Sequence, residues 1–165
     1  MIKAMILAAA ALTMSTTTVD AQTMIQKNEI KVDNRLMTPE ALWAMGRIGG
    51  AEASPNGKQI VYQVGYYSVK ENKSHQMLYI MNVDGSGIKA LTTDAKSETD
   101  ASWIANGTKI AFLREGEIWT MDANGENRKK LSDTEGAIEG YKFSPDGKSI
   151  LVSASPEAFN GIGKN

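Results

Sequence analysis

A repeat with a period of 40 residues constrains the fold of this chain more than any other feature. The segment Leu78–Asn82 reads Leu-Tyr-Ile-Met-Asn, and the segment Ile118–Asp122 reads Ile-Trp-Thr-Met-Asp, at an offset of 40. Two further pairs keep this offset: Asp84-Gly85 with Asn124-Gly125, and Leu91-Thr92 with Leu131-Ser132. Self-similarity at a fixed period indicates an architecture of repeated supersecondary units.

A second motif recurs near the start of each unit and is predicted to form a turn. It reads Ser-Pro-Asn-Gly-Lys at 54–58, Ala-Asn-Gly-Thr-Lys at 105–109 and Ser-Pro-Asp-Gly-Lys at 144–148. Its Asn or Asp falls at 56, 106 and 146, so the first spacing exceeds the second by ten residues. We therefore expect a ten-residue insertion in the first unit, at about Tyr66–His75, with a polar tip at Lys70–Ser74.

Each full unit is predicted to form four short strands. The segment Gln59–Val64 alternates as a half-buried strand does, and Pro-Asn-Gly and Pro-Asp-Gly are turn sequences. Four strands in ~40–45 residues is the size of a β-propeller blade. A β-sandwich would not repeat its turns and its aromatic position at a fixed offset. The predicted fold class is all-β: an incomplete propeller with blades at about 51–93 and 100–133 and part of a third at 138–155, within a region 51–165.

The first 21 residues have the pattern of a signal peptide. Lys3 precedes the apolar run Ala4–Met14, and Val19 and Ala21 stand at the −3 and −1 positions of a cleavage site. A buried N-terminal helix is the alternative. The run is too short to span a bilayer, and the chain has no cysteine to carry a lipid or a disulfide. We expect an exported bacterial protein, periplasmic or secreted, that has no membrane segment after cleavage.

A short helix is predicted in the lead-in, residues 22–50. Thr38 is a helix N-cap, Pro39 suits the first helical position, and Glu40 lies in the first turn. Leu42 and Met45 are expected to share a face of this helix, and the glycines at 46, 49 and 50 are expected to end it.

No residue is assigned as catalytic, cofactor-binding or metal-binding. The chain lacks a Gly-x-Ser-x-Gly nucleophile motif, and its single histidine, His75, is interpreted as a solvated loop residue. The segment Asn82–Gly87 is interpreted as a hairpin turn and not a calcium loop, because Thr93 stands where a Glu is required. The net charge of −1 argues against a nucleic-acid partner, and the basic run Arg128–Lys130 is interpreted as a solvated outer strand.

The aromatic residues of the repeat are expected to pack between units. Tyr79 and Trp119 occupy equivalent positions, as do Trp103 and Phe143. A ligand site would not recur from unit to unit, so core packing explains these positions better than a binding cage.

The segment Met37–Ile48, followed by Ala53–Lys58, resembles the start of secreted bacterial peptidases of the prolyl oligopeptidase family, in the dipeptidyl-peptidase and acylaminoacyl-peptidase branch. The resemblance covers about residues 37–153. It implies a propeller that caps a C-terminal α/β-hydrolase domain with a Ser-Asp-His triad and restricts access to small peptides. The expected chain is then an N-terminal propeller segment truncated before that domain, with no catalytic triad of its own.

The expected function is the non-catalytic propeller part of an exported serine exopeptidase, whose peptide substrates would be cleaved by the missing domain. The alternative is a TolB-like periplasmic propeller that serves as a protein-binding scaffold. TolB proteins place an α/β domain before the propeller, and only 29 residues, 22–50, are available for one here.

Overall fold

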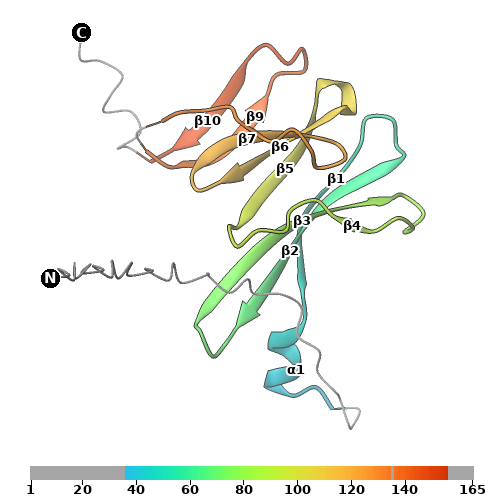
Figure 1. The fold of residues 1–165 in the computed structure, drawn as a ribbon, viewed down its shortest axis with the longest axis vertical. Coiled ribbons are helices and arrows are strands. Elements are labelled where there is room, and N and C mark those ends of the chain that lie inside the picture. The colour runs from blue at the N-terminus through green and yellow to red at the C-terminus, as the bar shows by residue number, and fades with distance from the viewer. Residues whose placement is uncertain (1–35, 135, 156–165) are drawn as a thin grey trace, which may run out of the picture.

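The computed structural model describes residues 36–134 and 136–155. The segment expected as a signal peptide, 1–21, lies outside the described residues, as do 22–35 and 156–165. One short helix, α1 (Pro39–Ala44), precedes ten strands that form three antiparallel sheets (Figure 1). The prediction of an all-β fold class is confirmed by these three sheets.

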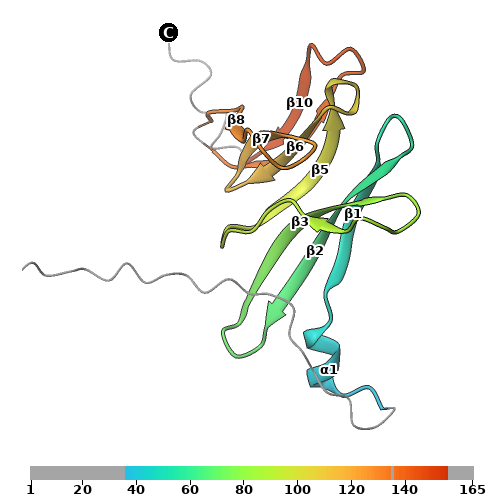
Figure 2. The same cartoon turned by 45° about the vertical axis from the view of Figure 1, so that its right-hand side comes forward.

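The sheets follow one another along the chain and in space, from the α1 end to the end that carries β10 (Figure 2). Neighbouring strands of each sheet are also neighbours in sequence, so every connection is a hairpin or a short turn. Sheet 1 contains β1 (Arg47–Ala53), β2 (Gln59–Ser68), β3 (Lys73–Asn82) and β4 (Lys89–Ala90). Sheet 2 contains β5 (Glu98–Ile104), β6 (Lys109–Arg114), β7 (Glu117–Asp122) and β8 (Lys129–Lys130), and sheet 3 contains β9 (Ile138–Phe143) and β10 (Ile150–Ala154).

The Ser-Pro-Asn/Asp-Gly-Lys motif closes the first hairpin of sheets 1 and 3 through the same three hydrogen bonds. Ser54 Oγ donates to Asn56 Oδ1 at 2.8 Å and accepts from the Gln59 backbone N–H at 2.9 Å. The Lys58 backbone N–H donates to the same Asn56 oxygen at 3.0 Å. Ser144 and Asp146 repeat this arrangement 90 residues later. The Ser and the Asn or Asp are therefore required to hold the turn shut.

The 40-residue period also has a structural basis in the outer half of each sheet. Thr92 Oγ1 accepts a hydrogen bond from the Leu78 N–H at 2.9 Å, and Ser132 Oγ accepts one from the Ile118 N–H at 2.8 Å. Both hydroxyls follow the two-residue outer strand, β4 or β8. Each supplies a partner to a backbone donor that the short strand leaves unpaired.

The main core lies between sheets 1 and 2. Val61 and Leu78 from sheet 1 pack with Phe112 from sheet 2, and all three are fully buried. Trp103 is 8% exposed within this core, and Trp119 packs against it, which confirms the packing role expected for these two residues.

Tyr79 belongs to a different cluster. It lies with Tyr62, Val64, Tyr66 and Met77. Tyr62 alternates with Val61 along β2, so this cluster occupies the opposite face of sheet 1. The two equivalent aromatic residues, Tyr79 and Trp119, thus pack in different clusters.

Sheet 2 packs on sheet 3 through a smaller cluster of Leu113, Ile118 and Ile138. The Tyr141 hydroxyl donates to the Asp100 carbonyl at 2.7 Å. The indole N–H of Trp103 makes a comparable bond to the Glu52 carbonyl of sheet 1 at 3.0 Å. Each sheet is therefore tied to the preceding one through an aromatic side chain of its first strand.

Two features of the lead-in differ from expectation. Strand β1 begins at Arg47, inside the segment 22–50, and runs through the glycines at 49 and 50 with a register shift between Ile48 and Ala51. Helix α1 buries Ala41, whereas Leu42 and Met45 are 47% and 46% exposed. The prediction that Leu42 and Met45 share a face of this helix was wrong, because the helix ends at Ala44 and Met45 follows it in an extended conformation.

The interpretation of His75 as a solvated loop residue was also wrong. His75 lies in β3, opposite Tyr66 in β2, and is 3% exposed. Its Nε2 atom is 3.2 Å from the Lys96 carbonyl oxygen, which belongs to the connection into sheet 2. The insertion lengthens the β2–β3 hairpin as paired strand, so a residue that looked like loop by composition became part of the sheet.

Candidate functional site

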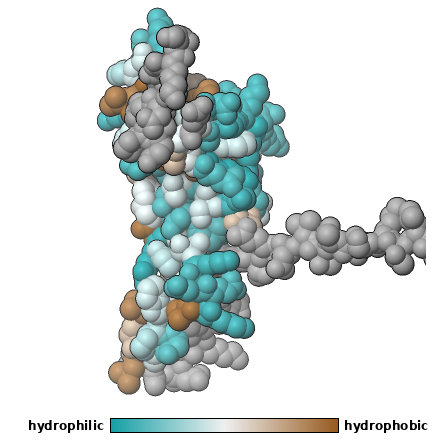
Figure 3. Space-filling model, turned by 90° about the vertical axis from the view of Figure 1, so that its left-hand side faces the viewer, coloured by the Kyte–Doolittle hydropathy of each residue, from teal (hydrophilic) through white to brown (hydrophobic). Residues whose placement is uncertain are grey.

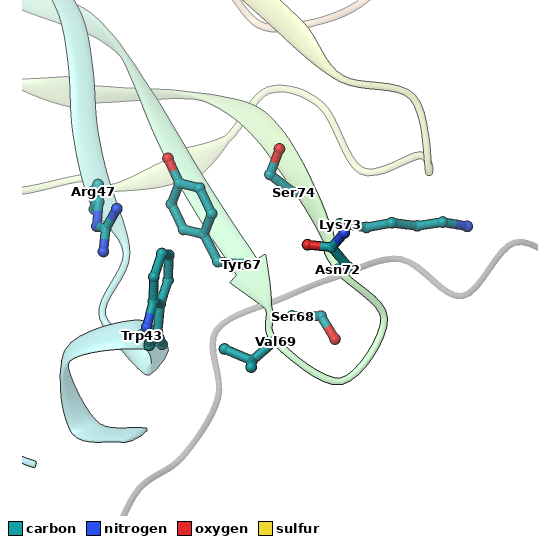
Figure 4. Close-up of a pocket in the computed structure, with 8 residues that line it drawn as sticks. All are labelled: Trp43, Arg47, Tyr67, Ser68, Val69, Asn72, Lys73 and Ser74. Atoms are coloured by element: carbon teal, nitrogen blue, oxygen red, sulfur yellow. The ribbon is translucent and has the colours of Figure 1, made fainter. Parts of the chain in front are cut away.

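A pocket forms where α1 meets the tip of the β2–β3 hairpin (Figure 4). We call it the α1–hairpin pocket. It has a volume of about 400 Å³ and is lined by Trp43, Arg47, Tyr67, Ser68, Val69, Asn72, Lys73 and Ser74. A neighbouring hollow of about 570 Å³ shares Trp43 and Tyr67 and adds Glu40 and Lys70.

Helix α1 positions one wall of the pocket. The Thr38 hydroxyl accepts a hydrogen bond from the Ala41 N–H at 3.2 Å, and Pro39 follows in the first turn, so the helix begins where the sequence predicted. One turn later Trp43 lies against Tyr67 of β2, with the ring centroids 5.8 Å apart and the planes at 63°. This edge-to-face contact fixes the helix on the hairpin.

The hairpin insertion supplies the other wall. Pairing between β2 and β3 continues to Tyr67 opposite Ser74 and Ser68 opposite Lys73. In sheet 2 the equivalent hairpin turns directly after Arg114. Six of the eight lining residues therefore come from the insertion, which has no equivalent in sheet 2.

Arg47 occupies the corner between the two rings. Its guanidinium carbon lies 4.7 Å from the centroid of Trp43 and 4.6 Å from that of Tyr67. The backbone before Arg47 lies close to β2 because residue 46 is a glycine. A Cβ at Gly46 would lie 2.9 Å from the Tyr66 ring and from Val64. Cation–π contacts with both rings orient the guanidinium at the pocket wall, as Figure 4 shows.

The pocket offers binding groups and no catalytic set. Its lining contains two cations, Arg47 and Lys73, several neutral hydrogen-bonding groups and no carboxylate. Across residues 36–134 and 136–155 no group of three or more His, Cys, Asp or Glu side chains could hold a metal ion. The Arg47 guanidinium lies against the two aromatic rings, whereas the Lys73 side chain extends away from them (Figure 4). The lining shows no nucleophile paired with a base.

A second polar cluster lies where the connection between β4 and β5 meets sheet 2, and it has a structural role. Glu98 is fully buried, and its Oε1 atom accepts from Arg114 at 3.0 Å. Arg114 also pairs with Asp94 at 2.7 Å, and Arg128 pairs with Asp94 at 3.3 Å. Burial, and secondly the negative charge of Asp94, raise the pKa of Glu98 to about 7. We call this set of residues the Glu98 cluster.

The basic run Arg128–Lys130 is more than a solvated outer strand. Arg128 donates to the Leu91 carbonyl as well as to Asp94, and so joins sheet 2 to the connection from sheet 1. Lys130 pairs with Glu117 at 3.1 Å and with Asp133 at 2.8 Å. The segment Asn82–Gly87 forms a turn, in which Asp84 Oδ1 accepts from the Ser86 N–H at 2.9 Å.

Sequence reasoning did not find the Arg47 corner. Trp43 and Arg47 stand four residues apart, but Arg47 lies beyond the end of the helix, so the helical spacing does not apply. Tyr67 falls inside the insertion, whose strand pairing was not expected. Two sequence features could have indicated this site: Trp43 and Arg47 in the lead-in, and the insertion that is present only in the first of the two full units.

The chain is similar in sequence to known peptidases. The chain is 42% identical over 123 residues to dipeptidyl-peptidase 5 of Porphyromonas endodontalis, a match that covers 72% of this chain and 18% of that relative. The chain matches the N-terminal propeller region of the prolyl oligopeptidase family. It thus spans less than a fifth of the length of this relative. No family model matches the chain.

Solved structures agree with the fold of the described residues. Acylaminoacyl peptidase of Pyrococcus horikoshii superposes with a TM-score of 0.55 at 18% identity, over 67% of this chain and 17% of that one. A putative TolB from Agrobacterium tumefaciens superposes with a TM-score of 0.52 at 23% identity, over 67% of this chain and 44% of that one. The fold of the described residues is therefore shared by an acylaminoacyl peptidase and by a putative TolB.

Proposed function

We propose that the three sheets are the first blades of a β-propeller, and that this propeller is the non-catalytic part of an exported serine exopeptidase acting on oligopeptides. Sheets 1 and 2 would be two complete four-stranded blades, and sheet 3 would be part of a third. The propeller would restrict access to an α/β-hydrolase domain located C-terminal to it.

The 42% identity to dipeptidyl-peptidase 5 carries this proposal. It is supported by the repeated interface between sheets, in which an aromatic donor of one sheet reaches a carbonyl of the preceding sheet, as Trp103 and Tyr141 do. An interface that repeats can be extended by adding further sheets of the same kind.

The genomic sequence after the codon for Asn165 tests the proposal. We expect further four-stranded units, then an α/β-hydrolase domain with a Gly-x-Ser-x-Gly motif. The full-length protein should react with a fluorophosphonate probe, which labels activated serines, and a variant with that serine replaced by Ala should not. A downstream sequence without a hydrolase domain would refute the proposal.

A TolB-like scaffold is the second candidate, favoured by the likeness to the putative TolB from Agrobacterium tumefaciens, of which this chain covers 44%. The two functions separate on the same evidence. A scaffold predicts that the propeller closes with no hydrolase domain after it and that the protein does not react with the probe.

Export is proposed from the pattern of residues 1–21. Among the described residues, no helix is long and apolar enough to cross a membrane. We expect N-terminal sequencing of the protein from the periplasm or medium to begin at Gln22. Recovery in the cytoplasm with Met1 retained would refute export.

A further inference from the structure

Three Asn-Gly pairs lie in turns of the described structure, and they begin at Asn56, Asn106 and Asn124. A fourth pair, which begins at Asn160, lies outside the described residues. In such a pair the backbone nitrogen of the glycine can attack the asparagine side chain, because glycine has no Cβ to obstruct the approach. Asparagine is accordingly counted among the thermolabile residues of proteins.

Exposure to solvent does not distinguish the three described asparagines. Each of them is exposed, and hydrophilic surface covers much of the face of the molecule that Figure 3 shows, with hydrophobic surface gathered towards its two ends. Water therefore reaches all three pairs. A difference in their reactivity has to come from the way in which each side chain is held.

Asn56 and Asn124 are each held by two side-chain hydrogen bonds. Asn56 Oδ1 accepts from the Ser54 hydroxyl at 2.8 Å and from the Lys58 N–H at 3.0 Å. Asn124 Oδ1 accepts from the Glu126 N–H at 3.0 Å, and Asn124 Nδ2 donates to Glu126 Oε2 at 2.9 Å. Both side chains must leave these partners before the glycine nitrogen can reach Cγ, and this requirement slows the reaction.

Asn106 is not held in this way. Ile104 stands where the first and third turns have Ser54 and Ser144, so the second turn lacks the serine hydroxyl. The Asn106 side chain makes no hydrogen bond with any residue that the structure describes. Ala105 and Asn106 have φ of +49° and +56°, a left-handed conformation that asparagine tolerates and alanine adopts only with strain. The strain favours rearrangement of this turn, and no side-chain hydrogen bond of Asn106 opposes it.

We propose that Asn106 is the residue of the described structure at which the chain deamidates spontaneously. The Gly107 nitrogen bonds to Asn106 Cγ, the bond from Cγ to Nδ2 breaks, and Nδ2 leaves as ammonia with the proton of the Gly107 N–H. Water then opens the resulting succinimide at either carbonyl, which gives aspartate or isoaspartate. The inference does not depend on the proposed function, since the reaction needs only the turn and solvent.

The modified turn lies at the contact between sheets 1 and 2. A Cβ on Gly107 would lie 3.0 Å from Cδ of Pro55, which belongs to the turn between β1 and β2. Both products add a negative charge beside this contact, and isoaspartate also lengthens the backbone by a methylene group. The modification therefore acts where two sheets meet and not in an isolated loop.

The test is tryptic peptide mapping by mass spectrometry after the purified, folded protein has been incubated in ¹⁸O-labelled water at mildly alkaline pH. The three pairs fall in separate tryptic peptides, 48–58, 97–109 and 115–128. The heavy oxygen marks only residues that reacted before digestion in ordinary water. We expect Asn106 to convert about tenfold faster than Asn56 or Asn124, because two hydrogen bonds of ordinary strength hold each of the other two. In urea the three should convert at similar rates, because each is followed by glycine.

A pair of matched variants tests the protective role of the hydrogen bonds. Ser54→Ala removes one of the two donors to Asn56 Oδ1, so Asn56 should deamidate several-fold faster while Asn106 keeps its rate. Ser144→Ala makes the same change in the equivalent turn, where the partner is Asp146, and it should leave all three rates unchanged. The comparison of folded and urea-unfolded wild type needs no variant, so it still tests the proposal if Ser54→Ala fails to fold.

Three results would overturn the proposal. The first is a rate at Asn106 in the folded protein that does not exceed the rates at Asn56 and Asn124. The second is the same preference for Asn106 in urea, which would assign it to the local sequence and not to the fold. The third is an unchanged rate at Asn56 in folded Ser54→Ala.

Discussion

Replacing Glu98 by Gln tests the electrostatics of the Glu98 cluster, where the β4–β5 connection meets sheet 2. The Glu98 side chain is fully buried, its Oε2 atom has no hydrogen-bond partner among the described residues, and its Oε1 atom pairs with Arg114 at 3.0 Å. Burial and the charge of Asp94 together outweigh the opposing effects of Thr92, Arg114 and Arg128, and raise the pKa from its usual 4.5 to about 7. The ionised form is therefore disfavoured in the folded protein relative to the unfolded chain.

The direction of the pH dependence follows from this shift. Because the folded-state pKa lies above the unfolded one, the stabilising contribution of Glu98 is fully present below about pH 4.5 and is lost as the pH rises through about 7. At about 1.4 kcal/mol per pKa unit, the loss amounts to about 3 kcal/mol, of which roughly 2 kcal/mol falls between pH 5 and 8.

The Glu98→Gln variant has the same shape and no titration, so it should lack this component. Urea unfolding, followed by tryptophan fluorescence at several pH values between 5 and 8, measures the free energy of unfolding of both proteins. We expect the variant to gain roughly 2 kcal/mol relative to the wild type across this range. Glu139→Gln, at an exposed position of β9, is the control for removal of a carboxylate outside the cluster. Parallel profiles for Glu98→Gln and the wild type would refute the reasoning.

Two further substitutions test the turns and the ties between sheets. Gly116 has φ +74°, and a Cβ there would lie 2.9 Å from Ala137 Cα, whereas Gly57 has φ +66° and open space around it. Gly57→Ala should lower the free energy of unfolding by about 1–2 kcal/mol because of backbone strain. Gly116→Ala should lower it by about 1–3 kcal/mol more because of the additional clash. Equal losses in the two variants would contradict a contribution from the clash. Trp103→Phe removes the 3.0 Å bond to the Glu52 carbonyl and should cost about 1 kcal/mol, measured by urea unfolding, and an unchanged midpoint would show that the bond does not stabilise the fold.

Local signals predicted much of the fold. The Ser54–Lys58 and Ser144–Lys148 segments form the expected turns, and Thr38 caps the expected helix. These features depend on residues within five positions of one another, so their hydrogen bonds can be inferred from a short window of sequence. The 40-residue offset also related more distant residues, because the equivalent hydroxyls of Thr92 and Ser132 accept the same hydrogen bond from a backbone N–H in sheets 1 and 2.

The missed pocket and the wrong interpretation of His75 have one common cause. Polar composition made the insertion look like a loop, but cross-strand pairing continued through it, and this buried His75 and placed Tyr67 beside Trp43. Composition reports solvation of an isolated segment, whereas strand pairing depends on the partner strand.

The sequence by itself determined the repeat, the positions of the turns, the helix start and the resemblance to prolyl oligopeptidase peptidases. Only the tertiary structure decided which side of sheet 1 meets sheet 2, where Glu98 and Arg114 are enclosed, and how α1 and the hairpin bring Arg47 to the corner between two rings. The physical reason is the separation in sequence of the residues that interact. Turns and caps are held by hydrogen bonds between near neighbours, while burial and the orientation of charges depend on residues that only folding brings together.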